Sequence, residues 1–230
     1  MSTRKIEVIS DPYDCGFSTC CSSHVHINSG LTVLVGCNGS GKTTMLMNIQ
    51  QYLDENSIPY LTFNENDLSS RAISKSFYES DYKSVVLMMS SSEGEKINVS
   101  LINFFKGLDQ FLKKGRVENS TSALWDALSE YKVPETNERW ILMDSVDSGH
   151  SLDNVEDFKA YAHDVVQYAE EQGYNLYLVC TTNSYELAKG ETCMDVTTGK
   201  YLSFSSYEEY REFVLSTRHK KDKRYDGLQE

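Results

Sequence analysis

Residues 36–43 read GCNGSGKT and directly follow the apolar run Leu31–Val35, whose aliphatic and β-branched side chains predict a buried strand. The pattern G-x-x-x-x-G-K-T between a strand and a helix is typical of a loop that binds the phosphates of a nucleotide. Its glycines let the backbone curl so that successive N–H groups point inward at phosphate oxygens. Lys42 adds a positive charge for the β- and γ-phosphates, and the Thr43 hydroxyl supplies one ligand for Mg²⁺.

A helix is expected directly after this loop, over residues 44–54, with Met45, Ile49 and either Tyr52 or Leu53 on its buried face. The N-terminus of such a helix carries partial positive charge and points at the same phosphates. Strand, loop and helix together predict a site for ATP and Mg²⁺. The residues expected to contact the nucleotide are Gly36, Asn38, Gly39, Ser40, Gly41, Lys42, Thr43 and Thr44.

The amino-acid composition limits the classes of protein to which the chain could belong. The chain has 230 residues and a formal net charge of −12, which allows a real core but gives no basic excess for a nucleic-acid partner. Its dense basic segment, residues 219–224, is expected to belong to a solvated tail. No apolar run reaches the roughly 20 residues of a membrane span, and residues 1–10 lack the apolar stretch of a signal peptide. We therefore expect a cytoplasmic protein whose cysteines are reduced.

Apolar strands alternate with amphipathic helices, which predicts an α/β fold of the P-loop NTPase type, with a mostly parallel central sheet flanked by helices. At the N-terminus, residues 4–10 and 25–27 instead predict an antiparallel β patch that leads into the phosphate loop. Further strands are expected at 59–63, 85–89, 140–143 and 176–180, a hairpin at 194–204, and helices at 71–78, 96–113, 121–131, 153–172 and 207–215.

Local signals set the expected boundaries. Asp153 and Glu156 resemble a capping box that begins a helix, and Gly173 ends it. The side chains expected to face inward from this helix are Val155, Phe158, Ala162, Val165 and Ala169. We expect an ATPase domain over 1–190, a hairpin and helix packed on it over 191–217, and a flexible charged tail over 218–230.

A second motif follows the loop later in the chain, because an apolar strand that ends in an acidic residue is the expected partner of a phosphate loop. The apolar run 140–143 ends in Asp144. An acidic residue at the end of such a strand holds Mg²⁺ through the water shell of the metal. The sequence therefore predicts that Asp144 lies opposite Thr43 and that these two residues are the metal ligands.

With these two motifs, the chain resembles the ABC-type ATPase superfamily, and it looks closest to the compact heads of the structural-maintenance-of-chromosomes and DNA-repair ATPases. The loop variant G-x-N-G-S-G-K-T-T, residues 36–44, carries the resemblance. Residues 91–96, SSEGEK, stand where the family has its L-S-G-G-E/Q signature, with Glu93 in place of a glycine. The resemblance implies that Ser92 and Gly94 bind the γ-phosphate held by a second subunit, so that ATP joins two copies in a head-to-tail homodimer.

The third family motif, D-E-x-x-S-G-L, is altered here to DSVDSGHS at residues 144–151. Ser145 stands at the position of the general-base glutamate, and serine does not accept a proton from water at neutral pH. Asn183 stands at the position of the switch histidine, and asparagine can bind a γ-phosphate but carries no proton. The resemblance thus implies catalytic positions at Lys42, Asp144, Ser145 and Asn183, with slow hydrolysis. A nucleotide switch acting on an unidentified protein partner is the function expected.

Two alternatives stay open. One is a binding module that does not hydrolyse ATP, and the other is a small-molecule kinase. A kinase of this type needs a lid with several arginines, whereas Arg71, Arg116 and Arg139 do not cluster in the sequence. The family glutamine loop has only Asn64 or Asn66 as its nearest counterpart, and Tyr13 and Phe17 are the candidates for stacking on adenine.

Overall fold

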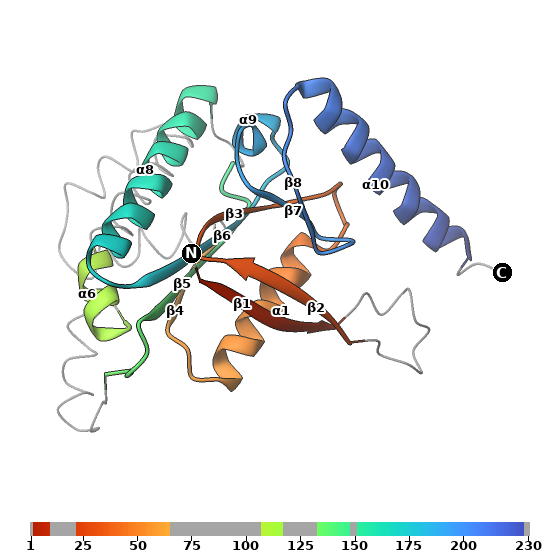
Figure 1. The fold of residues 1–230 in the computed structure, drawn as a ribbon. Helices are drawn as coiled ribbons and strands as arrows, with labels where there is room; N and C mark the ends of the chain where they lie inside the picture. Colours follow the sequence, from red (N-terminus) through yellow and green to blue (C-terminus); the bar gives the residue numbers. More distant parts are fainter. Residues whose placement is uncertain (1, 10–21, 65–106, 117–132, 148–150, 228–230) are drawn as a thin grey trace, which may run out of the picture.

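The computed structural model describes residues 2–9, 22–64, 107–116, 133–147 and 151–227 (Figure 1). Its strands are β1 (Thr3–Ile9), β2 (Ser22–Asn28), β3 (Gly30–Val35), β4 (Tyr60–Asn64), β5 (Glu138–Asp144), β6 (Asn175–Thr181), β7 (Cys193–Asp195) and β8 (Lys200–Leu202). Its helices are α1 (Lys42–Glu55), α6 (Leu108–Lys114), α8 (Leu152–Glu171), α9 (Tyr185–Ala188) and α10 (Tyr207–Gly227).

Within the described residues, the central sheet has six strands in the order β4-β5-β6-β3-β7-β8. All neighbours pair in parallel except β7 and β8, which form the antiparallel hairpin expected near the C-terminus. A separate antiparallel pair, β1 and β2, has Thr3 opposite Asn28 and confirms the β patch that precedes the phosphate loop. The mostly parallel α/β architecture predicted from the sequence is therefore confirmed.

One face of the sheet is covered by α8 together with α6, α9 and the first half of α10. The side chains of β3, β5 and β6 alternate between the two faces, as in any strand, and the set facing α8 includes Val33, Ile141 and Leu178. The five residues predicted for the inner side of this helix are its five buried residues. Hydrophobic burial of this continuous layer fixes α8 against the strands.

The opposite face of the sheet is covered by α1 and by the β1–β2 pair (Figure 1). Met45, Ile49 and Leu53 of α1 are buried there, as the helical spacing predicted. Trp140 of β5 stacks on Tyr177 of β6 with ring centroids 4.2 Å apart and an interplanar angle of 4°, so these two strands are joined by side chains as well as by backbone. This second core fixes the direction in which α1 leaves the phosphate loop.

Arg139 is fully buried between α6 and β5. Its guanidinium donates hydrogen bonds to four backbone carbonyls, those of Phe111, Leu112, Thr136 and Glu138. Two of these carbonyls belong to α6, whose last turn leaves carbonyl groups without helical partners. Arg139 therefore holds α6 to the sheet and takes no part in a phosphate-binding lid.

Two predicted boundaries differ from the structure. Ser151, not Asp153, is the N-cap of α8, and no side-chain hydrogen bond caps that end, so the capping box is wrong. The last helix extends past Leu215 to Gly227, which places the expected boundary at 217 and most of the expected tail inside α10. The strand at 85–89 and the helices at 71–78 and 121–131 lie outside the described residues, as does most of the helix at 96–113. In the described part of the chain, no helix is long and apolar enough to cross a membrane.

Candidate nucleotide-binding site

The predicted phosphate loop connects the end of β3 to the start of α1. Gly39 and Gly41 have φ values of 75° and 101°, a left-handed backbone region that side chains other than glycine rarely enter. A Cβ atom at Gly36 would collide with the Ser40 hydroxyl and come within 3.2 Å of Val196. The loop thus needs glycine at these positions for its own shape, as the sequence pattern predicted.

Lys42 is the first residue of α1 and is 9% exposed. Its Nζ donates to the carbonyl oxygens of Gly36 at 2.9 Å and Cys37 at 3.2 Å, so its ammonium group lies inside the curve of the loop. Burial lowers the pKa of Lys42 below its usual 10.5, against the opposing effects of Cys37, Asp147 and Asp144. An anion bound in the loop would therefore stabilise the desolvated ammonium group of Lys42.

Thr43 and Asp144 meet as predicted. The Thr43 hydroxyl donates to Asp144 Oδ2 at 2.9 Å, and the Thr181 hydroxyl donates to Asp144 Oδ1 at 2.6 Å. Thr181 also accepts the Ser145 backbone N–H at 2.7 Å. Because β6 lies between β3 and β5, Thr181 occupies the gap between the strand that leads into the loop and the strand that ends in Asp144.

Ser145 has a φ of 55°, a left-handed conformation that is unusual for a residue other than glycine. The bond from its N–H to Thr181 holds this conformation in place. Strained backbone of this kind clusters at functional sites, where surrounding contacts maintain it.

Asp147 turns toward the end of β6. Its Oδ2 accepts hydrogen bonds from the Thr182 hydroxyl at 2.7 Å and from the Asn183 backbone N–H at 2.9 Å. The position predicted to face a γ-phosphate, Asn183, is therefore fixed through its backbone, and its side chain is exposed. Asp147 also influences the pKa of Lys42, so its carboxylate belongs to the same electrostatic environment.

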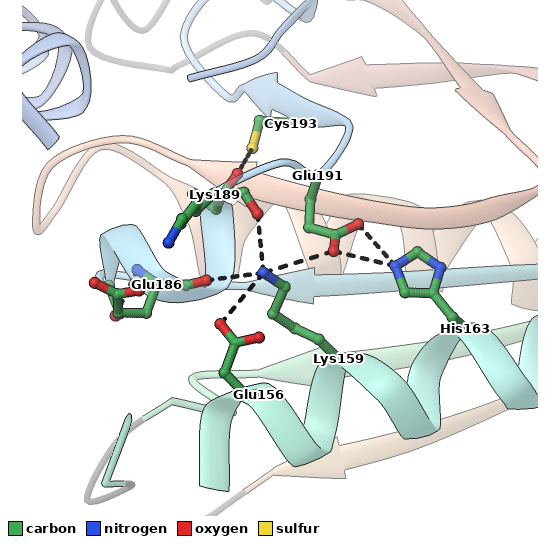
Figure 2. A network of polar contacts seen from close by, with 9 residues as sticks. Glu156, Lys159, His163, Glu186, Lys189, Glu191 and Cys193 are labelled. Atoms are coloured by element: carbon green, nitrogen blue, oxygen red, sulfur yellow. Dashed lines mark hydrogen bonds and ion pairs between the residues drawn. The ribbon is translucent and has the colours of Figure 1, made fainter. Parts of the chain in front are cut away.

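A polar cluster on α8 holds the segment that follows Asn183 (Figure 2). Lys159 Nζ donates to the carbonyls of Glu186 at 3.2 Å and Lys189 at 2.9 Å, at the C-terminal end of α9. Glu191 lies between Lys159 and His163, with its carboxylate 3.8 Å from the first and 3.0 Å from the second. A cation at a helix C-terminus stabilises the free carbonyls there. No sequence pattern marks this cluster, because its members become neighbours only when α9 packs on α8.

Two further residues touch the loop from outside, and the sequence did not point to them. Thr217 of α10 accepts the Cys37 N–H, and Lys221 donates to the Asn38 carbonyl at 3.0 Å. Their i, i+4 spacing places them on one side of α10, but no motif marks that helix as a neighbour of the loop.

Some of the remaining predicted site residues lie in the described part of the chain, and the others lie outside it. Asn38 and Thr44 are exposed at the loop, and the buried Ser40 hydroxyl makes no hydrogen bond to any described residue. Asn64 lies opposite Asp144 in the pairing of β4 with β5. Ser92, Gly94, Asn66, Tyr13 and Phe17 lie outside the described residues.

Three of the six cysteines are described: Cys37, Cys180 and Cys193 are buried free thiols. Burial raises the pKa of Cys193 to about 12, which keeps that thiol protonated near neutral pH. The expectation of reduced cysteines holds for these three residues.

The comparisons with known proteins find a likeness among solved structures but none among family models or curated sequences. No family model matches the chain, and no curated protein sequence matches it. Among solved structures, the chain is similar to a nucleotide-free ATP-binding cassette from an ABC transporter, with 13% identity and a TM-score of 0.42 over 93% of this chain and 94% of that one. The function proposed below therefore depends on the geometry of the loop and of its partners in this chain.

Proposed function

We propose that this chain binds Mg·ATP at residues 36–43, hydrolyses it slowly, and acts as a nucleotide switch. The observation that carries the proposal is the meeting of Thr43 and Asp144 at 2.9 Å, beside a buried Lys42. These residues come from distant parts of the sequence, yet the charges of Lys42 and Asp144 and the hydroxyl group of Thr43 lie close together beside the glycine loop. That combination suits a polyphosphate with a divalent cation.

The loop fits a phosphate by its unsatisfied groups. The Ser40 hydroxyl is buried without a hydrogen-bond partner among the described residues, and such a group is costly to leave unpaired. Lys42, held on two carbonyls of its own loop, can exchange these bonds for phosphate oxygens. Binding of an anion would satisfy both groups at once.

The pair Thr43 and Asp144 fits a magnesium ion. A hydroxyl and a carboxylate are the hard oxygen ligands that Mg²⁺ prefers. Bound Mg²⁺ would neutralise part of the charge that develops on the phosphates. Thr181, which bonds the other Asp144 oxygen, would keep that carboxylate in place while Thr43 turns from Asp144 to the metal.

Slow hydrolysis follows from the residues after Asp144. Ser145 has no carboxylate to accept a proton, and Asp147 is directed at Thr182 and Asn183. Loss of general-base catalysis typically costs about 10²–10⁴-fold in rate, while the electrostatics of Lys42 persist. The site therefore favours long occupation by ATP, as a switch requires.

The finer part of the proposal is an ATP-dependent head-to-tail homodimer that acts on a protein partner. It is supported by the resemblance of residues 36–44 and of the segment holding Ser92 and Gly94 to the ABC-type ATPases. In that arrangement each copy would complete the other's site.

Light scattering of the purified chain with Mg·ATP, Mg·ADP or no nucleotide tests the proposal, with phosphate release followed in the same samples. We expect a dimer with Mg·ATP only, and slow phosphate release that Lys42→Met abolishes. A monomer in all three samples, with normal ATP binding, contradicts the dimer and leaves a nucleotide-binding domain. Absence of ATP binding contradicts the whole proposal.

The non-hydrolysing module is the second candidate, and the hydrogen bonds of Asp147 favour it because they leave no base directed at the site among the described residues. Ser145→Glu separates the two, with Ser145→Gln as a control of equal size. A slow ATPase predicts that the glutamate variant turns over about 10²–10⁴-fold faster than the glutamine variant. Equal rates in the two variants favour the non-hydrolysing module.

A further inference from the structure

The last helix, α10, is attached to the body of the protein along one side. Tyr210 is buried in the hydrophobic core between α8 and the sheet, and Phe213 and Val214 pack against the same core. Thr217 is 1% exposed, although the neighbouring Ser216 and Arg218 are exposed. The spacing of these residues continues a single stripe of the helix. α10 is therefore packed against the body of the protein as far as the residue that contacts the phosphate loop.

Thr217 is joined to the loop by a buried hydrogen bond. The Cys37 N–H donates to Thr217 Oγ1 at 3.1 Å, while the same hydroxyl donates to the Val214 carbonyl at 2.8 Å. The Cys37 carbonyl accepts from Lys42 and from the Ser40 N–H. One residue of the loop thus connects α10 on its outer side with the phosphate-binding lysine on its inner side.

Lys221, one turn further along α10, extends this contact. Its Nζ donates to the Asn38 carbonyl, and it would lie 3.3 Å from a Cβ atom placed on Gly39. The lysine therefore lies against the most exposed part of the loop backbone. Its bond to a backbone carbonyl restrains the loop at this point.

We propose that Thr217 and Lys221 are positioning residues that hold the phosphate loop in its binding conformation, so that α10 and the nucleotide site are thermodynamically coupled. The proposal rests on the proposed function, because it identifies α10 as the element through which nucleotide binding at that site affects the protein surface. Linkage makes the effect reciprocal: if docked α10 favours nucleotide, bound nucleotide favours docked α10 by the same factor.

The expected effects follow from the contacts. Thr217→Val removes the buried acceptor and leaves the Cys37 N–H unpaired, and a loss of this kind corresponds to about a five- to tenfold weaker affinity for Mg·ATP. Lys221→Met removes a more exposed bond, and we expect about a two- to threefold loss. Thr217→Ser keeps the acceptor and should bind as the wild type does. Lys220→Met, on an exposed neighbour, is the matched control for the lysine.

Amide exchange gives a measurement that needs no nucleotide. We would follow hydrogen exchange of the Cys37 amide by NMR in the nucleotide-free wild type and in the four variants, and measure Mg·ATP dissociation constants by calorimetry. We expect faster exchange at Cys37 in Thr217→Val and wild-type exchange in Thr217→Ser. Nucleotide should in turn slow exchange of the α10 amides around Thr217.

The outcomes separate the two proposals. Unchanged exchange at Cys37 in Thr217→Val overturns the positioning role. Faster exchange with an unchanged dissociation constant overturns the coupling and leaves a purely structural contact. If Thr217→Val does not fold, Lys221→Met compared with Lys220→Met still decides the matter, because equal dissociation constants in these two variants overturn the coupling. A wild type that binds no nucleotide sinks the proposed function, while exchange at Cys37 still decides whether Thr217 holds the loop.

Discussion

Thr43 and Asp144 are 101 positions apart in the sequence, yet the hydroxyl of the first and the carboxylate of the second form a 2.9 Å hydrogen bond. Thr43 lies in α1, just after the loop that follows β3, whereas Asp144 ends β5. β3 and β5 are not neighbours, since β6 runs between them. The bond exists because all three strands are parallel, so their carboxyl ends meet at one edge of the sheet. Ligands of open α/β sheets bind at this edge.

Asp144→Asn is expected to weaken binding only when the metal is present. The amide keeps the shape of the side chain but loses the charge, and loss of a group that orients a metal typically costs about 10- to 100-fold in affinity. Calorimetry with Mg·ATP and with ATP in EDTA measures both values. Asp157→Asn, on an exposed residue of α8, is the control. Equal losses with and without Mg²⁺ would mean that Asp144 does not act through the metal.

Lys42→Met is expected to change the pH dependence of stability. Burial lowers the pKa of Lys42 in the folded chain below 10.5, so the unfolded chain binds this proton more tightly. The cost of the buried charge is fully present below the folded pKa and is relieved as pH rises toward 10.5. The stability of Lys42→Met relative to the wild type should therefore fall over that alkaline range.

Urea unfolding at several alkaline pH values measures this difference, with Lys220→Met as an exposed control. A gap between Lys42→Met and wild type that stays constant up to pH 10.5 contradicts the desolvated lysine.

Ser145→Gly is expected to stabilise the chain by about 1 kcal/mol, because glycine adopts the left-handed backbone without the steric cost that serine carries there. Ser57 has nearly the same φ, 53° against 55°, just after α1, and makes Ser57→Gly a matched control outside the site. Thermal unfolding should show a rise of about 2–4 °C for each. A gain at Ser57 with none at Ser145 would indicate that the Ser145 side chain itself stabilises the site.

Arg139→Met is expected to destabilise the chain by about 3 kcal/mol, since a buried carbonyl left unsatisfied costs roughly 1–3 kcal/mol. The four carbonyls that Arg139 holds include two of α6, so that helix should loosen first. Denaturant unfolding and hydrogen exchange of α6 measure the two effects. Arg218→Met, on the exposed side of α10, should leave both unchanged. Unaltered α6 exchange in Arg139→Met would show that packing alone holds the helix.

The conformation of the glycine loop and the position of Asp144 could be predicted because short local sequence patterns specify them. A glycine loop, a lysine and a strand-end carboxylate each have a short pattern, and parallel strands bring them together. Residues 36–43 have the left-handed glycines and the buried Lys42 that this pattern requires. The roles of Ser92, Gly94, Ser145 and Asn183 in catalysis stay predictions.

The contacts that support the site had no such pattern. Thr217 is a threonine among polar residues, and only the docking of α10 makes it buried. The basic segment at 219–224 suggested a tail because charge density does not reveal that one side of a helix already has a partner. Ser151 was missed as N-cap because Asp153 and Glu156 have the spacing of a capping box within the first turn.

The position of β6 also determines when the site can assemble as the chain is made. β3 and β5 precede β6 in the sequence, but β6 pairs with both, and its last residue, Thr181, holds Asp144. A nascent chain that stops before residue 175 contains both motifs without the strand that joins them. Such non-local pairing is slow to form. The proposed capture of ATP would therefore begin late in translation, long after the glycine loop has left the ribosome.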